Sequence, residues 1–288
     1  MNNRTGGLSG ELDDQRYDPG PEFRYPDSGE MLEDASVLRN AIMFTIAQRA
    51  YVADSLLHQP FDRLPQNVLA FVTLEAFGVE MTATEDALGW LFALRDWGPG
   101  TAKNCLMANL DSIQVGRGKY DEAHATEFLA SLDGPKLREV LHIPEDDVLR
   151  EAGMEEELIT QVETSMPHKL DGLRRVAEKR VESNRTRVEA FNKLKHMLLA
   201  FATRETGSKH VQVKLMKGRG YQEGEIHLNT VTLEVSAVNV RNMAGNALAM
   251  QASLWDILAL ILWVRFGERH DPPPWMLHAM EHGNWREG

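Results

Sequence analysis

The sequence predicts a mainly α-helical protein: an irregular bundle of long helices with a small β-hairpin inserted before the last core helix. Two observations support this class. Most of the chain carries apolar residues at the spacing of a buried helix face, and only the segment 208–235 has the alternation and β-branched residues typical of strands. The chain has 288 residues, of which 43% are hydrophobic, so it can bury a sizeable core.

The domain organisation is expected to be simple. Residues 1–30 combine glycines, prolines and acids without periodic apolar positions, which predicts a disordered acidic arm. Residues 31–288 are expected to form a single helical domain, with 101–164 as a candidate helical subregion. The first helix is predicted at 31–58 and the second at 64–97, where Gly78 marks a close contact or a break and Thr84 caps a second piece. Shorter helices are predicted next, at 101–111, 120–132, 136–141 and from Pro144 onward.

The second half of the chain is predicted to hold a basic helix, the hairpin and an apolar helix. Pro167 divides a helical stretch at 154–202 and leaves a basic helix from Lys169 to about Phe201. The β-hairpin at 208–235 follows. The last helix is expected from about Ala237 to Gly267, with a nearly all-apolar section at 254–264. That section is too short for a membrane span, so we expect a buried core helix and no membrane partner.

Composition excludes several classes of site. Cys105 is the single cysteine, which excludes a disulfide framework and a cysteine-based metal site within one chain, and we expect it in the core. The absence of a signal-like segment favours a cytoplasmic protein. The net charge is −12, yet 168–219 contains 14 Lys and Arg against 5 Asp and Glu. This basic segment either faces phosphates or matches acidic helices within the fold.

One face of the predicted basic helix carries four different polar groups, at Arg185, Glu189, Asn192 and His196. His196 could act as a general acid or base, with Asn192 orienting it and Arg185 holding a phosphate. Further phosphate contacts are predicted at Arg187, Lys193 and Lys195, and in the hairpin loop at Lys217, Arg219 and Tyr221, where the tyrosine could stack on a base. The alternative is a structural cluster, in which Glu189 pairs with Arg185 and His196 bonds a carbonyl of the hairpin.

The run Phe191-Asn-Lys-Leu-Lys-His196, late in a long helix and followed by a β segment and an apolar helix, resembles a group of uncharacterised bacterial helical proteins similar to the HEPN superfamily. The resemblance implies a helical bundle, often dimeric, that cleaves RNA without a metal or only binds it. His196 matches the family's histidine, and Asn192 matches its polar residue loosely. The resemblance therefore implies RNA and a second copy of the chain as partners.

Metal sites are not predicted. His278 and His282 match an H-x-x-E-H pattern, but too few residues follow to supply a third ligand downstream. The only Glu-x-x-His pair joins Glu139 to His142, whereas a carboxylate-bridged di-metal bundle needs two such pairs. Glu75 is interpreted as a buried acid paired with a basic helix residue. No metal and no small-molecule cofactor is expected.

Two functional hypotheses from different classes follow. The first is an RNA-directed protein that binds RNA or cleaves it without a metal, with the polar stripe open to solvent. The second is a non-catalytic helical scaffold or protein-interaction module, with the stripe buried and its polar groups satisfied. The sequence leaves open which applies, and whether the protein is an enzyme.

Overall fold

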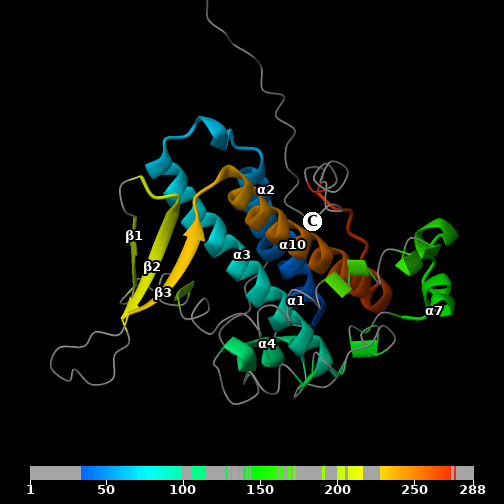
Figure 1. The fold of residues 1–288 in the computed structure, drawn as a ribbon. Helices are drawn as coiled ribbons and strands as arrows, with labels where there is room; N and C mark the ends of the chain where they lie inside the picture. The colour runs from blue at the N-terminus through cyan, green and yellow to red at the C-terminus, as the bar shows by residue number, and fades with distance from the viewer. Residues whose placement is uncertain are drawn as a thin grey trace, which may run out of the picture. The chain divides into compact units, whose positions relative to one another are not determined.

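The computed structural model is mainly helical, with a small antiparallel sheet before the last helix, which confirms the predicted fold class (Figure 1). The residues it describes are 34–98, 105–114, 127–128, 131, 136, 139–140, 142, 144–160, 162–164, 168–169, 171–172, 190–191, 200–204, 207–216, 228–273 and 276. The predicted arm at 1–30 lies outside them.

The predicted first helix is confirmed as three consecutive helical segments: α1 (Asp34–Asn40), a π-helical segment η1 (Ala41–Thr45) and α2 (Ile46–Leu57). A stripe of almost fully buried side chains runs along all three, at Leu38, Ile42, Ile46, Ala50 and Ala53. Wider i→i+5 turns disturb the usual backbone hydrogen bonds. Trp255 Nε1 donates to the Ile42 carbonyl at 3.1 Å, so the π segment is tied to the last helix.

The second predicted helix is one continuous element, α3 (Gln66–Arg95), and the predicted break at Gly78 or Thr84 is wrong. Thr84 does not cap a new helix, because its hydroxyl donates to the Glu80 carbonyl at 2.7 Å, four residues back in the same helix. Pro65 precedes the helix, and its carbonyl accepts from Leu69 N at 2.9 Å. A short 3₁₀ helix, η2 (Phe61–Arg63), connects α2 to this start.

The last long helix is α10 (Ala237–Phe266), close to its predicted bounds. Ser236 caps it by accepting from Asn239 N at 3.1 Å, and Gly267 ends it in the left-handed conformation (φ +72°) that glycine adopts without strain. The helix is long and apolar enough to cross a membrane by length and composition, but 72% of that stretch is buried within the protein, as in a core helix. The dimer that the resemblance implies stays a prediction.

α3 and α10 lie side by side and run in the same direction (Figure 1). Contacts between them follow the same order along both helices. Asn246 Nδ2 donates to Glu80 Oε1 at 2.9 Å, and Gln251 Nε2 donates to Asp86 Oδ2 at 2.8 Å. α2 packs against α10 and also contacts α3. These three helices therefore form the centre of the fold.

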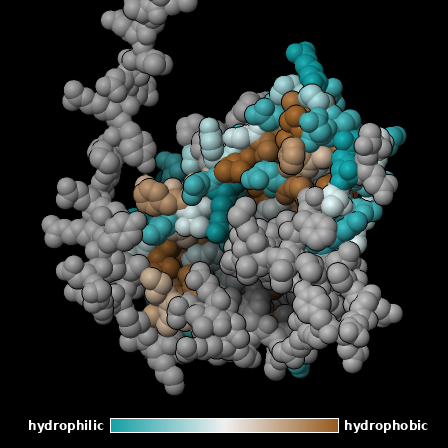
Figure 2. Space-filling model, turned by 90° about the vertical axis from the view of Figure 1, so that its left-hand side faces the viewer, coloured by the Kyte–Doolittle hydropathy of each residue, from teal (hydrophilic) through white to brown (hydrophobic). Residues whose placement is uncertain are grey.

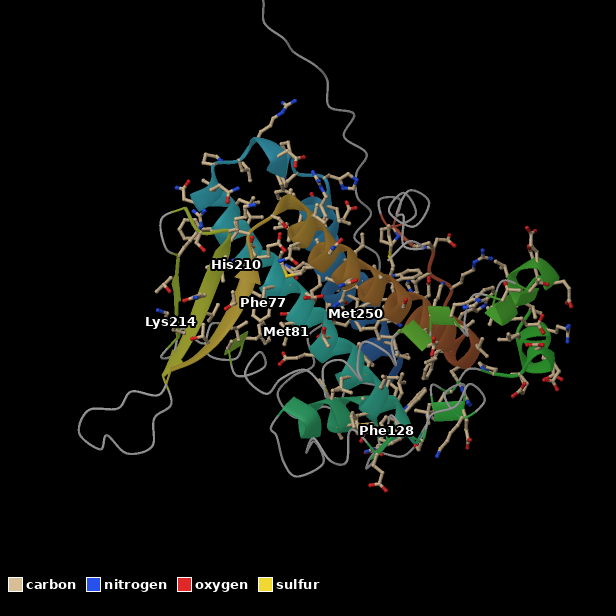
Figure 3. All side chains as sticks on the ribbon, in the orientation of Figure 1. Phe77, Met81, Phe128, His210, Lys214 and Met250 are labelled. Atoms are coloured by element: carbon tan, nitrogen blue, oxygen red, sulfur yellow. The ribbon has the colours of Figure 1, made fainter. Side chains whose placement is uncertain are left out.

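The sheet has three antiparallel strands in the order β1 (Ala200–Thr203), β2 (His210–Met216) and β3 (Leu228–Glu234). The β2–β3 pair confirms the hairpin, with His210 opposite Glu234. Valine and leucine side chains of β2 and β3 are buried on one face, and Figure 3 places Phe77 and Met81 of α3 beside that core. β1 corrects the prediction that the basic helix reaches Phe201, because Phe201 pairs with Lys214 in the sheet.

The shorter helices agree with their predictions in part. α4 (Leu106–Gln114) lies a few residues later than the expected 101–111, and α7 (Asp146–Glu151) begins two residues after Pro144. Cys105 is buried directly before α4, as predicted, and its sulfur lies 3.5 Å from Ala108 N. The rest of the candidate subregion 101–164 is described only in part, so its separate status stays a prediction.

Candidate functional site

The site residues predicted from sequence lie outside the described residues. These are Arg185, Arg187, Glu189, Asn192, Lys193, Lys195, His196, Lys217, Arg219 and Tyr221. Their neighbours Ala190 and Phe191 are helical and buried in the core beneath the sheet. The polar stripe therefore stays a prediction. The described residue Phe191 next to it packs into the core.

Two described members of the basic segment contact the protein itself. Lys169 forms an ion pair with Asp256 of α10, and both side chains are largely shielded from solvent. Arg204 donates to the Ser208 carbonyl at 2.6 Å and to Gln66 at 3.3 Å. The Lys169–Asp256 pair agrees with the internal-match interpretation of the basic segment, whereas the partners of Arg204 are uncharged.

The described residues include no site for the metal candidates of the sequence. Within the described ranges, no group of three His, Cys, Asp or Glu residues could hold a metal ion. His278 and His282 lie outside those ranges. The interpretation of Glu75 as a buried acid is wrong, because this side chain is exposed on α3.

A cavity of about 730 Å³ opens among α2, α3 and α10, and we call it the α2–α3–α10 pocket. Its apolar lining consists of Val52, Phe71, Leu74, Phe77, Gly78, Val79, Ala83, Phe191 and Ala247. Its polar lining consists of Gln48, Arg49, Glu75, Thr82 and Gln251. An apolar cavity of several hundred Å³ with a few convergent polar groups is the usual form of a small-molecule site.

Helical spacing explains how the chain builds this pocket. Phe71, Glu75, Gly78 and Thr82 follow one another at three- or four-residue steps on α3, so they share one face. Small residues then leave the volume open. A Cβ added to Gly78 would meet no described atom within 4 Å. This position on α3 therefore leaves open space beside the helix.

The pocket ends on a polar group formed by Arg49, Asp86 and Gln251. Asp86 forms an ion pair with Arg49 and accepts from Gln251 Nε2 at 2.8 Å. The Gln251 side chain is almost fully buried, at 1% exposure. Its Oε1 is withdrawn from solvent and accepts no hydrogen bond from the described residues. Buried acceptors are nearly always satisfied in folded proteins, and among the described residues Asp54 Oδ1 and Arg49 Nη1 are likewise buried without a hydrogen-bond partner.

The mouth of the pocket is apolar. Phe71 is 71% exposed and Val52 is 38% exposed, and both line the cavity. Val68, one turn before Phe71 on α3, is exposed to the same degree as Val52. In the view of Figure 2, hydrophobic residues gather in separate groups between hydrophilic ones. Exposed apolar residues that form a contiguous patch, rather than single ones, mark ligand or partner sites.

A second polar cluster lies at the C-terminal ends of α3 and α10, and we call it the sealed cluster. Asp34 accepts from Trp97 Nε1 at 2.7 Å and from Leu106 N at 2.8 Å. His142 Nε2 lies 2.7 Å from the Leu94 carbonyl, and its ring stacks edge-on against Trp97. Burial lowers the pKa of His142, although the hydrogen bond to Leu94 opposes the shift. These side chains have hydrogen-bond partners within the fold.

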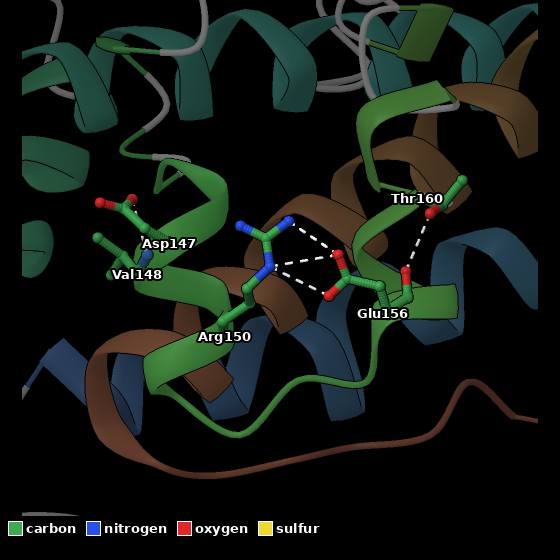
Figure 4. A network of polar contacts seen from close by, with 5 residues as sticks. All are labelled: Asp147, Val148, Arg150, Glu156 and Thr160. Carbon is green, nitrogen blue, oxygen red and sulfur yellow. Dashed lines mark hydrogen bonds and ion pairs between the residues drawn. The ribbon is translucent and has the colours of Figure 1, made fainter.

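Two further ionic contacts are structural. Burial raises the pKa of Asp256, although the ammonium of Lys169 opposes the shift. On the surface, Arg150 of α7 holds Glu156 through a forked contact of 2.8 to 3.2 Å (Figure 4). Hydrogen bonding to Arg150 lowers the pKa of Glu156. Both of these side chains are exposed, so the pair contributes little to stability and forms no cavity.

No family model, curated protein or solved structure matches the chain.

The sequence analysis missed the residues that form the pocket. Gln251 interrupts the apolar run of α10, and Asp86 interrupts that of α3. A polar residue within an apolar helix stretch is the one signal that could have found them. Their proximity depends on the parallel packing of α3 and α10, which spacing along one helix does not reveal.

Proposed function

We propose that the protein is a non-catalytic helical binding module whose α2–α3–α10 pocket takes a small, largely apolar molecule. The observation that carries the proposal is the combination of an apolar cavity of about 730 Å³ with a buried polar end at Gln251. This combination gives a ligand both apolar contact and a fixed orientation.

Apolar contact supplies most of the expected affinity. A ligand that buries about 200 Å² of apolar surface gains roughly 5 kcal/mol at about 25 cal/mol per Å². Association and ordering offset part of this gain. The exposed Phe71 lies at the mouth, where it would cover a bound molecule. We therefore expect weak binding, with a dissociation constant of about 0.2 mM or higher.

The charged groups favour binding over catalysis. Among the described lining residues, Arg49 and Glu75 carry charge, and none is a histidine, cysteine or lysine. Arg49 is engaged by Asp86, and Glu75 is exposed to solvent. General acid–base chemistry favours a group whose pKa lies near neutrality, and nucleophilic chemistry requires an activated side chain. The lining offers neither.

Nile red, an uncharged apolar dye, is the probe that tests the proposal. We expect its emission to rise and saturate at one dye per chain. Gly78→Phe should abolish this saturable binding because the new side chain fills the cavity. Gly89→Phe is the matched control, since Gly89 also lies in α3 with no described atom near a built Cβ, but it does not line the pocket. Equal binding to both variants would contradict the proposal.

A second candidate function is RNA-directed, as a HEPN-like protein that acts as a dimer. It is supported by the positive balance of 168–219 and by the run that ends at His196. Figure 3 shows His210 and Lys214 of the same segment on β2. The test incubates mixed cellular RNA with the protein in the presence of a chelator. Cleavage lost in His196→Ala would support this function, and neither cleavage nor RNA binding at low salt would exclude it.

A further inference from the structure

Two exposed polar side chains border the apolar mouth of the α2–α3–α10 pocket. Gln48 lies on α2 and Glu75 on α3, and both line the cavity. Together with Val52 and Phe71 they are the exposed members of the described lining, so each of the two helices contributes one polar and one apolar side chain. A ligand that fills the cavity therefore has one end beside an aromatic ring, a carboxylate and an amide.

The Glu75 carboxylate is accessible to a ligand. Its side chain is exposed, and it forms no hydrogen bond or ion pair with the residues that the structure describes. In this it differs from Gln251 Oε1, of which less than 1 Å² is accessible. The other charged lining residue, Arg49, is engaged by Asp86. Glu75 therefore supplies the unpaired charge of the pocket.

Phe71 and Glu75 present a ring and a carboxylate side by side. They are four residues apart on α3, a spacing that makes two side chains neighbours on one helix face, and the ring is 71% exposed. The face of an aromatic ring attracts a cation, and so does a carboxylate. A ligand carboxylate would instead be repelled by Glu75 and would find Arg49 already paired. The mouth therefore favours a positive charge over a negative one.

We infer that the ligand of the pocket is an amphiphilic amine, with an apolar body that fills the cavity and a protonated amino group at the mouth, against Phe71 and Glu75. This inference rests on the proposed function and specifies the chemistry of its ligand. The ammonium contacts the ring and the carboxylate, and Gln48 offers its amide oxygen as a further acceptor. The apolar body contacts Leu74 and Val79 in the cavity.

The cost of moving a charge out of water decides which end of the molecule enters. Inside the pocket an ammonium would lie among apolar side chains and near the guanidinium of Arg49, where it has no unpaired acid to balance it. At the mouth it keeps part of its hydration and gains two favourable contacts. Both contacts are weak because they are exposed, so an amine should bind about 5- to 10-fold more tightly than a neutral analogue.

A matched pair of probes tests the inference: 2-(2-naphthyl)ethylamine, which is protonated at about pH 7, and 2-(2-naphthyl)ethanol, which is neutral. Both carry the same apolar body, and each is titrated calorimetrically into the protein at low ionic strength. We expect the wild-type protein to bind the amine about 5- to 10-fold more tightly. In Glu75→Gln, which keeps the size of the side chain without its charge, the preference should fall to about 2-fold, the part that the Phe71 ring supplies.

Glu151→Gln is the matched control, because Glu151 is an exposed glutamate of α7 that does not line the pocket. It changes the net charge of −12 by the same amount as Glu75→Gln does. It therefore separates a contact at the mouth from the general attraction of an acidic protein for cations. Glu151→Gln should keep the preference of the wild-type protein. Thermal melts confirm that both variants are folded.

The possible outcomes separate the inference from the proposed function. Equal binding of the amine and the alcohol, or binding of neither while Nile red still binds, would overturn the inference and leave the proposed function intact. A preference that persists undiminished in Glu75→Gln, or that falls equally in Glu151→Gln, would also overturn the inference, because the amine would then not contact Glu75. Failure of both probes and of Nile red to bind the wild-type protein would overturn the proposed function itself.

Discussion

The sealed cluster and the α2–α3–α10 pocket both include α3, and their buried polar groups differ in whether they have partners. In the sealed cluster, Asp34 accepts from both Trp97 and Leu106, and His142 bonds the end of α3. In the pocket, Gln251 uses its NH₂ group on Asp86 and leaves its oxygen without a described partner. The polar groups of the sealed cluster have partners within the fold, whereas the pocket has a cavity and an acceptor without a described partner.

This difference distinguishes polar groups that stabilise the fold from polar groups that could contribute to binding. A polar group with partners inside the protein strengthens the fold, and removing it should lower stability. A polar group that lacks a partner beside a cavity adds little to stability, so its effect should show in binding. Five predictions test this comparison, from the largest expected effect to the smallest.

The largest effect is expected in the sealed cluster. Asp34→Ala removes the acceptor for the Trp97 indole and for the first turn of α4, leaving two donors unsatisfied. It should lower the free energy of unfolding by about 2–3 kcal/mol, measured by urea denaturation. Gln251→Met is the comparison in the pocket and should lower it by about 1 kcal/mol or less, because it also removes an unsatisfied oxygen. Equal losses would show that both regions are structural.

The ion pair between Lys169 and Asp256 is shielded from solvent, so removing one partner should destabilise the protein by leaving the other charge unpaired. Lys169→Met leaves a carboxylate without its partner and should lower the free energy of unfolding by about 1–3 kcal/mol, more than Asp256→Asn does. The reverse order would show that the pair is solvated.

The same pair gives a pH dependence. The pKa of Asp256 is raised above its ordinary value of 3.8, so its contribution to stability is greatest below that value. The contribution is lost as the pH rises through the folded pKa. Relative to Asp256→Asn, the wild-type protein should lose stability from about pH 4 upward, which chemical denaturation at a series of pH values would measure.

His142 should give the sealed cluster the opposite response to acid. Its pKa is lowered from 6.5, so the folded protein favours the neutral ring. Its contribution is present above pH 6.5 and is lost as the pH falls through the folded pKa. His142→Asn, in which asparagine tolerates the left-handed backbone (φ 53°), should flatten this part of the stability profile. An unchanged profile would show that another group titrates there.

The smallest effect is expected from the glycines of α3. Gly78→Ala and Gly89→Ala should each raise the free energy of unfolding by about 0.5–1 kcal/mol, because alanine favours the helix and neither Cβ meets a described atom. Thermal melts test both. A loss of stability at Gly78 alone would show that the pocket is narrower at this point than described.

The sequence predicted the elements whose signals are local. The apolar stripe at 31–58, the bounds of the last helix near Ala237 and Gly267, and the alternation of β2 all lie within single elements. The break in α3 was mispredicted because Thr84 and Asp86 look like a helix start, whereas tertiary packing keeps the helix continuous. β1 was mispredicted because its four residues form a strand only by pairing with β2.

The candidate site was beyond local signals for the same reason. Arg49, Asp86 and Gln251 come from three helices, and a polar residue within an apolar run marks Asp86 and Gln251 without showing that they meet. The space beside Gly78 depends on how the neighbouring helices pack against α3. The predicted stripe around His196 could be drawn because all its members belong to one helix.

Calorimetric titration tests most directly whether the α2–α3–α10 pocket binds a ligand. The neutral apolar amide 2-naphthylacetamide is titrated into the wild-type protein, Gly78→Phe and Gly89→Phe. We expect one site per chain with a negative heat-capacity change, as apolar burial requires. Gly78→Phe should remove the site, and Gly89→Phe should keep it. Absence of binding to the wild-type protein, or equal binding to Gly78→Phe, would contradict the assignment of the α2–α3–α10 pocket as a ligand site.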